Sequence, residues 1–482
     1  MNLSGRLLKN TFLFLILFEL ISFIIAKNQS LNSLVFLIII FTTLVLALIK
    51  LEYGLYVLLT ELFVGGYGYL FNFDLGGFTI SLRLGLFIIL LISWLIKLLT
   101  DPKKSLPSFL VQIKNYPYKI NYLLIFLLLI FGVINSFWHN NLTKVFLDVN
   151  AWFYFVLIFV FLTTIKNEKV VQNIITVLVA ATTFLAIKTL LVLFLFSHGV
   201  TSINDYFYQW LRNTGVGEVT YISGAVFRVF FQSQLYCLIG FLIILTFLAL
   251  NMNFKNWRSY WPLIAYSYLA GLAILISQSR SFWVGGIAAL IFLLVYLILT
   301  KLTIKKIVVI LLILILGLIS QIGLIQVITG DFSGNLVNQR FANLEKEPAS
   351  LSRLNQLKPL MQAIYQSPIL GYGFGKELTY QSSDPRIVKT YPNGIYTTYA
   401  FEWGYLDIIL KIGLVGLLVY LALIVQLFFK RISNTKSLEN SLSVGLSLGL
   451  LALCIVNIFS PYLNHPLGIG YLMLISVIKY AN

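Results

Sequence analysis

The chain consists largely of continuous apolar runs of about 17 to 25 residues, separated by short polar connections. Each run is long enough to cross a hydrocarbon core of about 30 Å as an α-helix. A membrane β-barrel would show short alternating segments instead, and a water-soluble fold could not cover this much apolar surface. The pattern therefore predicts an all-α, polytopic integral membrane protein, with one transmembrane domain over residues 1–482.

We expect about fourteen membrane-spanning helices from these runs. The predicted ranges are 11–26, 31–49, 53–71, 80–99, 120–138, 149–165, 170–196, 229–251, 261–277, 282–300, 307–328, 397–429, 440–458 and 465–480. The first run lacks a small-residue cleavage site after it, so we expect it to be retained as a helix. No segment remains for a soluble domain, and we detect no internal repeat.

Basic residues cluster at one set of helix ends, as short cytoplasmic loops do. These residues are Arg6, Lys9, Lys50, Lys103, Lys104, Lys114, Lys119, Lys166, Lys169, Lys255, Arg258, Lys301, Lys305, Lys306, Lys430, Arg431, Lys436 and Lys479. We therefore expect both termini to be cytoplasmic. The opposite ends include two longer segments, 197–228 and 329–396, which we expect to be extracytoplasmic.

The overall charge and the rarer side chains exclude several kinds of protein. Although the net charge is +17, the basic residues are spread between apolar runs, so we expect no nucleic-acid partner. Cys237 and Cys454 both lie within apolar runs, which is typical of small buried residues. The histidines His139, His198 and His465 are far apart, and no Asp-x-Asp pair occurs. We expect neither a metal site nor a cofactor.

The long segment 329–396 carries an amphipathic pattern. Apolar residues recur at spacings of three and four from Ser352 onward, at Leu354, Leu357, Leu360, Met361 and Ile364. This spacing predicts a helix along the membrane surface, with Ser352 as its N-cap and Pro359 as a kink or restart in its second turn.

Three glycines follow this helix at alternate positions, Gly371, Gly373 and Gly375, in the sequence SPILGYGFG. Such spacing suits a turn where backbone N–H groups come close to a ligand. An ordinary loop accounts for the same spacing.

Three arginines lie near predicted helix ends on the extracytoplasmic side. Arg280 stands between two apolar runs, Arg228 lies at the outer end of an earlier helix, and Arg353 opens the amphipathic helix. Each is explained either by a side chain that reaches up to the membrane interface or by pairing with an anion. Because guanidinium donates in pairs to phosphate oxygens, convergence of the three would form a diphosphate site.

Two carboxylates, Glu402 and Asp407, stand at the start of the run after the long segment. They are either interface groups or an acid/base site at the membrane boundary. Lys188, Glu19 and Glu61 are further charges within predicted spans, and we expect them to pair between helices or in a cavity.

Four segments in this order resemble one family. The sequence SQSRSFW at 277–283, Arg353, the run 368–375 and the run 404–416 resemble the O-antigen ligase and Wzy-type polysaccharide polymerase superfamily of bacterial membrane proteins. The likeness covers about residues 220–480 in order and spacing. Before residue 220, the shared feature is the multi-span character.

The resemblance implies a metal-independent glycosyltransferase in the bacterial plasma (inner) membrane. It implies transfer of a glycan from a polyprenyl diphosphate, such as undecaprenyl diphosphate, to another sugar on the extracytoplasmic face. Its arginines would hold the diphosphate. The residues that we expect to bind substrate are Arg228, Arg280, Arg353, Gly371, Gly373, Gly375 and Tyr405.

One position departs from the family. Its ligases carry a histidine shortly before the Tyr-Leu of the re-entering helix, where this chain has Glu402. A carboxylate can also take a proton from a sugar hydroxyl, so Glu402 and Asp407 are the candidate catalytic residues. They lie about 140° apart around an ideal helix, so we expect one of them to matter strongly.

We therefore expect a polymerase that joins lipid-linked repeat units into O-antigen, capsule or exopolysaccharide, with a flippase and a chain-length regulator as candidate partners. A ligase-type transferase acting on another acceptor is the first alternative. A transporter or flippase for lipid-linked sugars is the second, and it would show inverted repeats and charges deep in several spans. The polar groups gather instead at one face and in one segment, which favours an enzyme.

Overall fold

The computed structural model describes residues 3–300, 304–331, 348–432 and 439–478 and confirms an all-helical membrane-protein fold. The helices are α1 (Gly5–Ile25), α2 (Gln29–Ile49), α3 (Leu51–Val64), α4 (Leu82–Thr100), α5 (Pro102–Asn115), α6 (Lys119–His139), α7 (Leu142–Val149), η1 (Trp152–Leu157), α8 (Ile158–Thr164), α9 (Glu168–Ser197), α10 (Thr201–Asn213), α11 (Gln234–Asn251), η2 (Phe254–Tyr260), α12 (Trp261–Ser277), α13 (Arg280–Leu299), α14 (Ile304–Thr329), α16 (Pro348–Gln366), α17 (Pro385–Thr390), α18 (Gly404–Ile432), α19 (Glu439–Phe459), η3 (Tyr462–Asn464) and α20 (Pro466–Ile478), where η marks a 3-10 helix.

Within the described part of the chain, three short antiparallel hairpins interrupt the helices. They are β1 (Asn72–Asp74) with β2 (Thr79–Ser81), β3 (Gly217–Ser223) with β4 (Val226–Phe231), and β5 (Leu378–Gln381) with β6 (Ile395–Thr398). Each hairpin lies in a connection between helices.

The expected count of about fourteen spans is not confirmed. Within the described residues, eleven helices are long and apolar enough to cross a membrane, or twelve if the bent pair of α7 with η1 and α8 forms one span. The apolar runs at 53–71, 149–165 and 465–480 instead form the shorter α3, the bent η1–α8 segment and α20. A helix buried inside the protein is as apolar as a helix that faces lipid. Composition therefore does not distinguish a buried helix from a membrane-spanning one.

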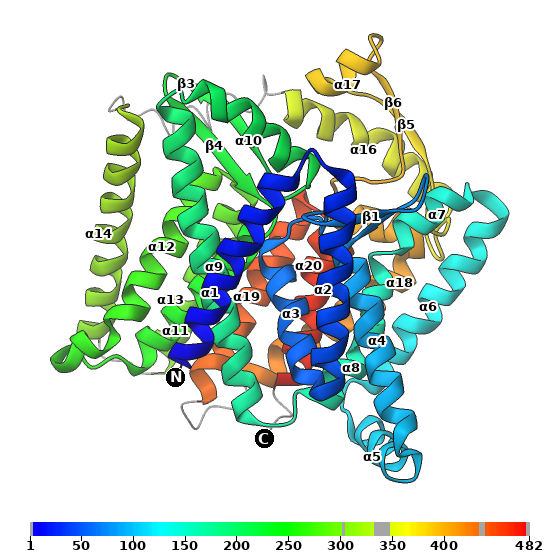
Figure 1. The fold of residues 1–482 in the computed structure, drawn as a ribbon, viewed down its shortest axis with the longest axis horizontal. Coiled ribbons are helices and arrows are strands. Elements are labelled where there is room, and N and C mark those ends of the chain that lie inside the picture. Colours follow the sequence, from blue (N-terminus) through cyan, green and yellow to red (C-terminus); the bar gives the residue numbers. More distant parts are fainter. Residues whose placement is uncertain (1–2, 301–303, 332–347, 433–438, 479–482) are drawn as a thin grey trace.

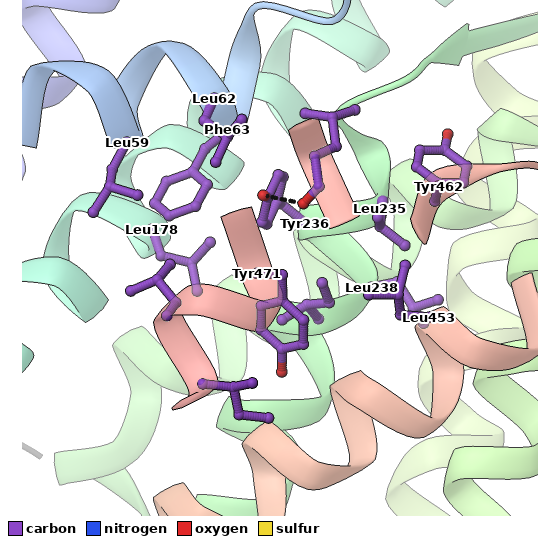
Figure 2. Packing of buried hydrophobic residues seen from close by; sticks show 14 of the residues in the cluster. Leu59, Leu62, Phe63, Leu178, Leu235, Tyr236, Leu238, Leu453, Tyr462 and Tyr471 are labelled. Carbon is purple, nitrogen blue, oxygen red and sulfur yellow. Dashed lines mark hydrogen bonds between the residues drawn. The ribbon is translucent and has the colours of Figure 1, made fainter. Parts of the chain in front are cut away.

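Helix α20 lies in the middle of the bundle, and every residue from Leu467 to Ile478 is buried. Figure 2 shows its surroundings, where aromatic and leucine side chains of α3, α9, α11 and α19 pack against it. The Tyr236 hydroxyl donates to the carbonyl of Leu467 at 2.6 Å, and the Tyr471 hydroxyl donates to that of Leu446 at 2.6 Å. These contacts fix α20, and with it the preceding turn η3.

The charges that the sequence places within spans form buried ion pairs between helices, as expected. Lys188 Nζ lies 2.5 Å from Glu19 Oε2. Arg83 binds Glu61 through two hydrogen bonds, each 2.9 Å long. A charge in an apolar interior is costly unless it is paired, so each pair links two helices at a defined point.

The helix of the long segment is present but begins earlier than expected. Helix α16 starts at Pro348, and Ser352 lies inside it with its Oγ 2.7 Å from Ser382 Oγ. The prediction of Ser352 as N-cap was therefore wrong, because the helix gains a turn before it. Pro359 lies in the interior and does not end the helix. Residues 332–347, Lys301, Lys436 and Lys479 lie outside the described residues.

The two ends of the bundle carry different elements (Figure 1). Helices α10, α16 and α17 and the hairpins β3–β4 and β5–β6 gather at one end, whereas α5 and the start of α1 lie at the other. The two ends are therefore expected to face opposite sides of the membrane.

This arrangement predicts how single cysteines will react in intact cells. Ser383→Cys, between β5 and α17, should react with a membrane-impermeant thiol reagent, because its end is expected to be extracytoplasmic. Ser108→Cys in α5 should react after permeabilisation alone. The natural Cys237 and Cys454 are buried or half-buried and give the background. Protection of Ser383→Cys until permeabilisation would reverse the orientation.

Candidate functional site

Helix α16 folds back onto the start of α18 and brings the long segment against the membrane domain. The contact has an apolar cluster formed by Leu360, Ala363, Ile364, Phe401, Ile409 and Leu410. Two polar contacts flank it: Gln356 Oε1 accepts from the N–H of Glu402 at 3.2 Å, and Trp403 Nε1 donates to the carbonyl of Arg353 at 2.9 Å. The segment just before α18 is thus held by both side-chain and backbone groups of α16.

Two of the predicted site residues meet at this contact. The Arg353 guanidinium forms an ion pair with the Glu402 carboxylate through Nε and Oε2. Their side chains are 37% and 43% exposed, so the pair is accessible from outside the protein. The residues are far apart in the chain and are adjacent here because α16 docks on the start of α18.

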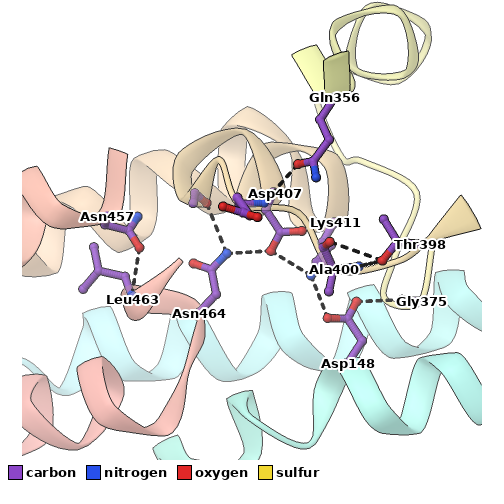
Figure 3. Close-up of polar contacts among 12 residues, drawn as sticks. Asp148, Gln356, Gly375, Thr398, Ala400, Asp407, Lys411, Asn457, Leu463 and Asn464 are labelled. Carbon is purple, nitrogen blue, oxygen red and sulfur yellow. Dashed lines mark hydrogen bonds and ion pairs between the residues drawn. The ribbon is translucent and has the colours of Figure 1, made fainter. Parts of the chain in front are cut away.

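Asp407 lies one turn further along, in a buried network that Figure 3 shows. Lys411 Nζ lies 2.6 Å from Asp148 Oδ1 and 2.7 Å from Asp407 Oδ2. Asn464 Nδ2 donates to Asp407 Oδ2 at 2.6 Å, and the N–H of Gly375 donates to Asp148 Oδ2 at 2.8 Å. The network joins α7, α18, η3 and the glycine run around a single cation.

Sequence reasoning missed Lys411, Asp148 and Asn464. A signal was present for Lys411, because it follows Asp407 at the i, i+4 spacing that places two side chains on one helix face. No such signal connects Asp148 or Asn464 with α18, because those contacts join segments far apart in the chain.

The three glycines of the run have positive φ values of 70°, 80° and 74° at Gly371, Gly373 and Gly375. A Cβ at Gly371 would lie 2.7 Å from the carbonyl oxygen of Leu410, and a Cβ at Gly373 would lie 2.4 Å from Ser136 Oγ. The close approach expected of these glycines is therefore made to α18 and α6, and the N–H groups of Gly373 and Gly375 bind protein oxygens.

Arg228 and Arg280 lie near one another in the fold. Arg228 is on β4, and its Nε donates to the carbonyl of Ser277 at 3.0 Å. Arg280 opens α13 immediately after this turn, in which Gln278 has a left-handed φ of 45°. Arg228 is thus bound to the turn between α12 and α13, and Arg280 follows directly after that turn.

Aromatic contacts connect this turn with η3, which supplies Asn464 to the buried network. The ring of Phe282 lies 5.8 Å from that of Phe230 and 5.9 Å from that of Tyr462. Tyr405, near the start of α18, donates its hydroxyl to the carbonyl of Cys454 at 2.8 Å. The arginine turn and the start of α18 are therefore both packed around the end of α19 and η3.

His465 directly follows Asn464, the η3 residue of the buried network. Burial, together with the charge of Arg83, lowers the pKa of His465 to about 3. Its Nδ1 accepts from the N–H of Leu467 at 3.3 Å, and its ring lies 5.6 Å from that of Tyr67. A neutral ring of such low basicity is unsuited to accept a proton at neutral pH.

One of three comparisons with known proteins gave a match. Residues 265–421 match the family model Wzy_C, which is described as O-antigen ligase. The match begins in α12 and ends in α18, and it includes Arg280, Arg353, Glu402 and Lys411. The comparisons with curated proteins and with solved structures found no match. Residues 265–421 of this helical membrane protein are therefore similar to the O-antigen ligase family, consistent with the O-antigen ligase/Wzy superfamily.

Proposed function

We propose that this protein is a polysaccharide polymerase that joins repeat units carried on polyprenyl diphosphate. The observation that carries the proposal is the contact between Arg353 and Glu402 at an accessible edge of the membrane domain. It places a donor suited to phosphate beside a carboxylate that can take a proton, within the region that matches the family.

The reaction needs both kinds of group. The bond between the anomeric carbon of the donor glycan and its diphosphate oxygen breaks, and a bond from that carbon to the acceptor hydroxyl oxygen forms. The diphosphate leaves with the bonding electrons, and Arg228, Arg280 and Arg353 stabilise the charge that develops on it. The hydroxyl proton passes to the Glu402 carboxylate.

Glu402 is better suited to this role than Asp407. The Asp407 side chain is 3% exposed and bound to Lys411 and Asn464, so it is far less accessible to an acceptor sugar. The Glu402 side chain is 43% exposed. A general base must come within hydrogen-bond reach of the hydroxyl that it deprotonates, which favours the accessible carboxylate.

A ligase is the second candidate, because the matching family model is described as O-antigen ligase. The two functions share the donor chemistry and differ in the acceptor. Purified protein given lipid-linked repeat units alone separates them: a polymerase makes longer lipid-linked chains, and a ligase makes none until a different acceptor is added.

The first prediction concerns the base. Glu402→Gln keeps the side-chain shape and removes the proton acceptor, so polymer formation should fall by about 10²- to 10⁴-fold at matched expression. Glu377→Gln is the control, because Glu377 is similarly exposed and pairs with Lys144 at 3.9 Å. Near-normal polymer with Glu402→Gln would remove this role.

The second prediction concerns the arginines. Arg228→Lys, Arg280→Lys and Arg353→Lys keep the charge but lose the planar fork, so each should reduce the rate of polymer formation. Arg212→Lys is the matched control, since Arg212 on α10 forms an ion pair at 3.8 Å with Glu218 on β3. Three fully active variants would show that these arginines do not hold the diphosphate.

The third prediction separates stability from chemistry at the buried network. Lys411→Met leaves Asp148 and Asp407 facing each other without a cation, which should cost about 3–5 kcal/mol of stability and lower Tm. Asp407→Asn retains the ion pair of Lys411 with Asp148 and should cost less. Loss of polymer with Asp407→Asn at unchanged Tm, together with active Glu402→Gln, would move the base to Asp407.

A further inference from the structure

We infer that Glu402 and the donor diphosphate compete for the Arg353 guanidinium, so that donor binding releases the carboxylate that serves as the base. The inference rests on the proposed function and adds a regulation of the same site. It starts from the contact between Arg353 and Glu402. In the proposed reaction, Arg353 binds the donor diphosphate and Glu402 takes the proton of the acceptor hydroxyl.

The pair has the properties of a contact that can open. Both side chains are more than a third exposed, so water and salt screen their attraction. Carboxylate and diphosphate can each accept from two guanidinium N–H groups at once, but a diphosphate carries more charge. The donor would therefore be a stronger partner for Arg353 than Glu402 is.

The buried ion pairs of the described residues differ in this respect, whereas Lys144 and Glu377 form a similarly exposed pair. The side chains of Lys411, Arg83 and Lys188 and of their carboxylate partners are at most 8% exposed. Opening any of these pairs would leave a charge in the apolar interior. The pair between Arg353 and Glu402 lies instead where both charges can be hydrated when they separate.

The surrounding structure does not depend on the pair. Gln356 binds the N–H of Glu402, and Trp403 binds the carbonyl of Arg353, both without using the charged groups. The apolar cluster between α16 and α18 adds to these contacts. Helix α16 therefore stays docked while the two side chains exchange partners.

The exchange has a consequence for the order of binding. The Glu402 oxygen that contacts Arg353 is occupied and cannot accept from an acceptor hydroxyl. If the diphosphate takes Arg353, this carboxylate oxygen becomes free to accept the hydroxyl proton beside the glycan that is about to be attacked. Donor binding then prepares the site for the acceptor, and an acceptor without donor meets a blocked base.

The test measures binding of farnesyl diphosphate to full-length protein in nanodiscs. Glu402→Gln removes the competitor, so Kd should fall by about two- to five-fold. Arg353→Gln should raise Kd. The double variant should match Arg353→Gln, because there is no longer a guanidinium to release. Glu377→Gln, from the exposed pair with Lys144, should leave Kd unchanged. Equal Tm values show that the variants are folded.

Each other outcome has a distinct meaning. If wild type binds and Glu402→Gln does not bind more tightly, the competition is wrong while the diphosphate site stands. If Glu402→Gln tightens binding equally with Arg353→Gln in the background, general charge repulsion explains the gain and the competition is wrong. If no folded variant binds, the diphosphate site of the proposed function is wrong, and this inference is wrong with it.

Discussion

The arrangement around the site depends on one buried ammonium group. Lys411 lies between Asp148 and Asp407 in an apolar interior, where neither carboxylate could remain charged at low cost without it. Because Asp148 also binds the N–H of Gly375 and Asp407 also binds Asn464, the cation fixes four chain segments relative to one another. Glu402 lies at the accessible edge of this network. The residue that fixes the segments, Lys411, is therefore different from the residue proposed to take the proton, Glu402.

The sequence predicted the helical membrane fold well, because lipid demands long continuous apolar runs. It predicted the number of spans less well, since α3 and α20 are apolar for a different reason: protein surrounds them. The start of α16 was missed by a turn because Ser352 has the residue type of an N-cap. Its hydroxyl contacts Ser382, which no local pattern reveals.

The candidate site was predictable to a similar degree. A charge beside an apolar run is costly, so Arg280, Arg353 and Glu402 were visible as exceptions along the chain. Which of these charges meet was not visible, because the pairing of Arg353 with Glu402 depends on how α16 docks. The role of Gly371, Gly373 and Gly375 could not be predicted either. A glycine with positive φ allows close approach to a ligand and close approach to another helix alike.

One backbone feature connects the start of α18 with the glycine run at 368–375. At Gly413, with φ 69° and ψ −177°, the N–H groups of Leu414 and Val415 turn from their own helix to the carbonyls of Pro368 and Ile369. The carbonyls of Leu410 and Lys411, left without these partners, accept from the N–H groups of Tyr372 and Gly373. The two segments have exchanged hydrogen bonds as neighbouring strands do. Residues 404–412 are therefore joined through backbone hydrogen bonds to residues 368–373, at a break in α18 that Gly413 marks.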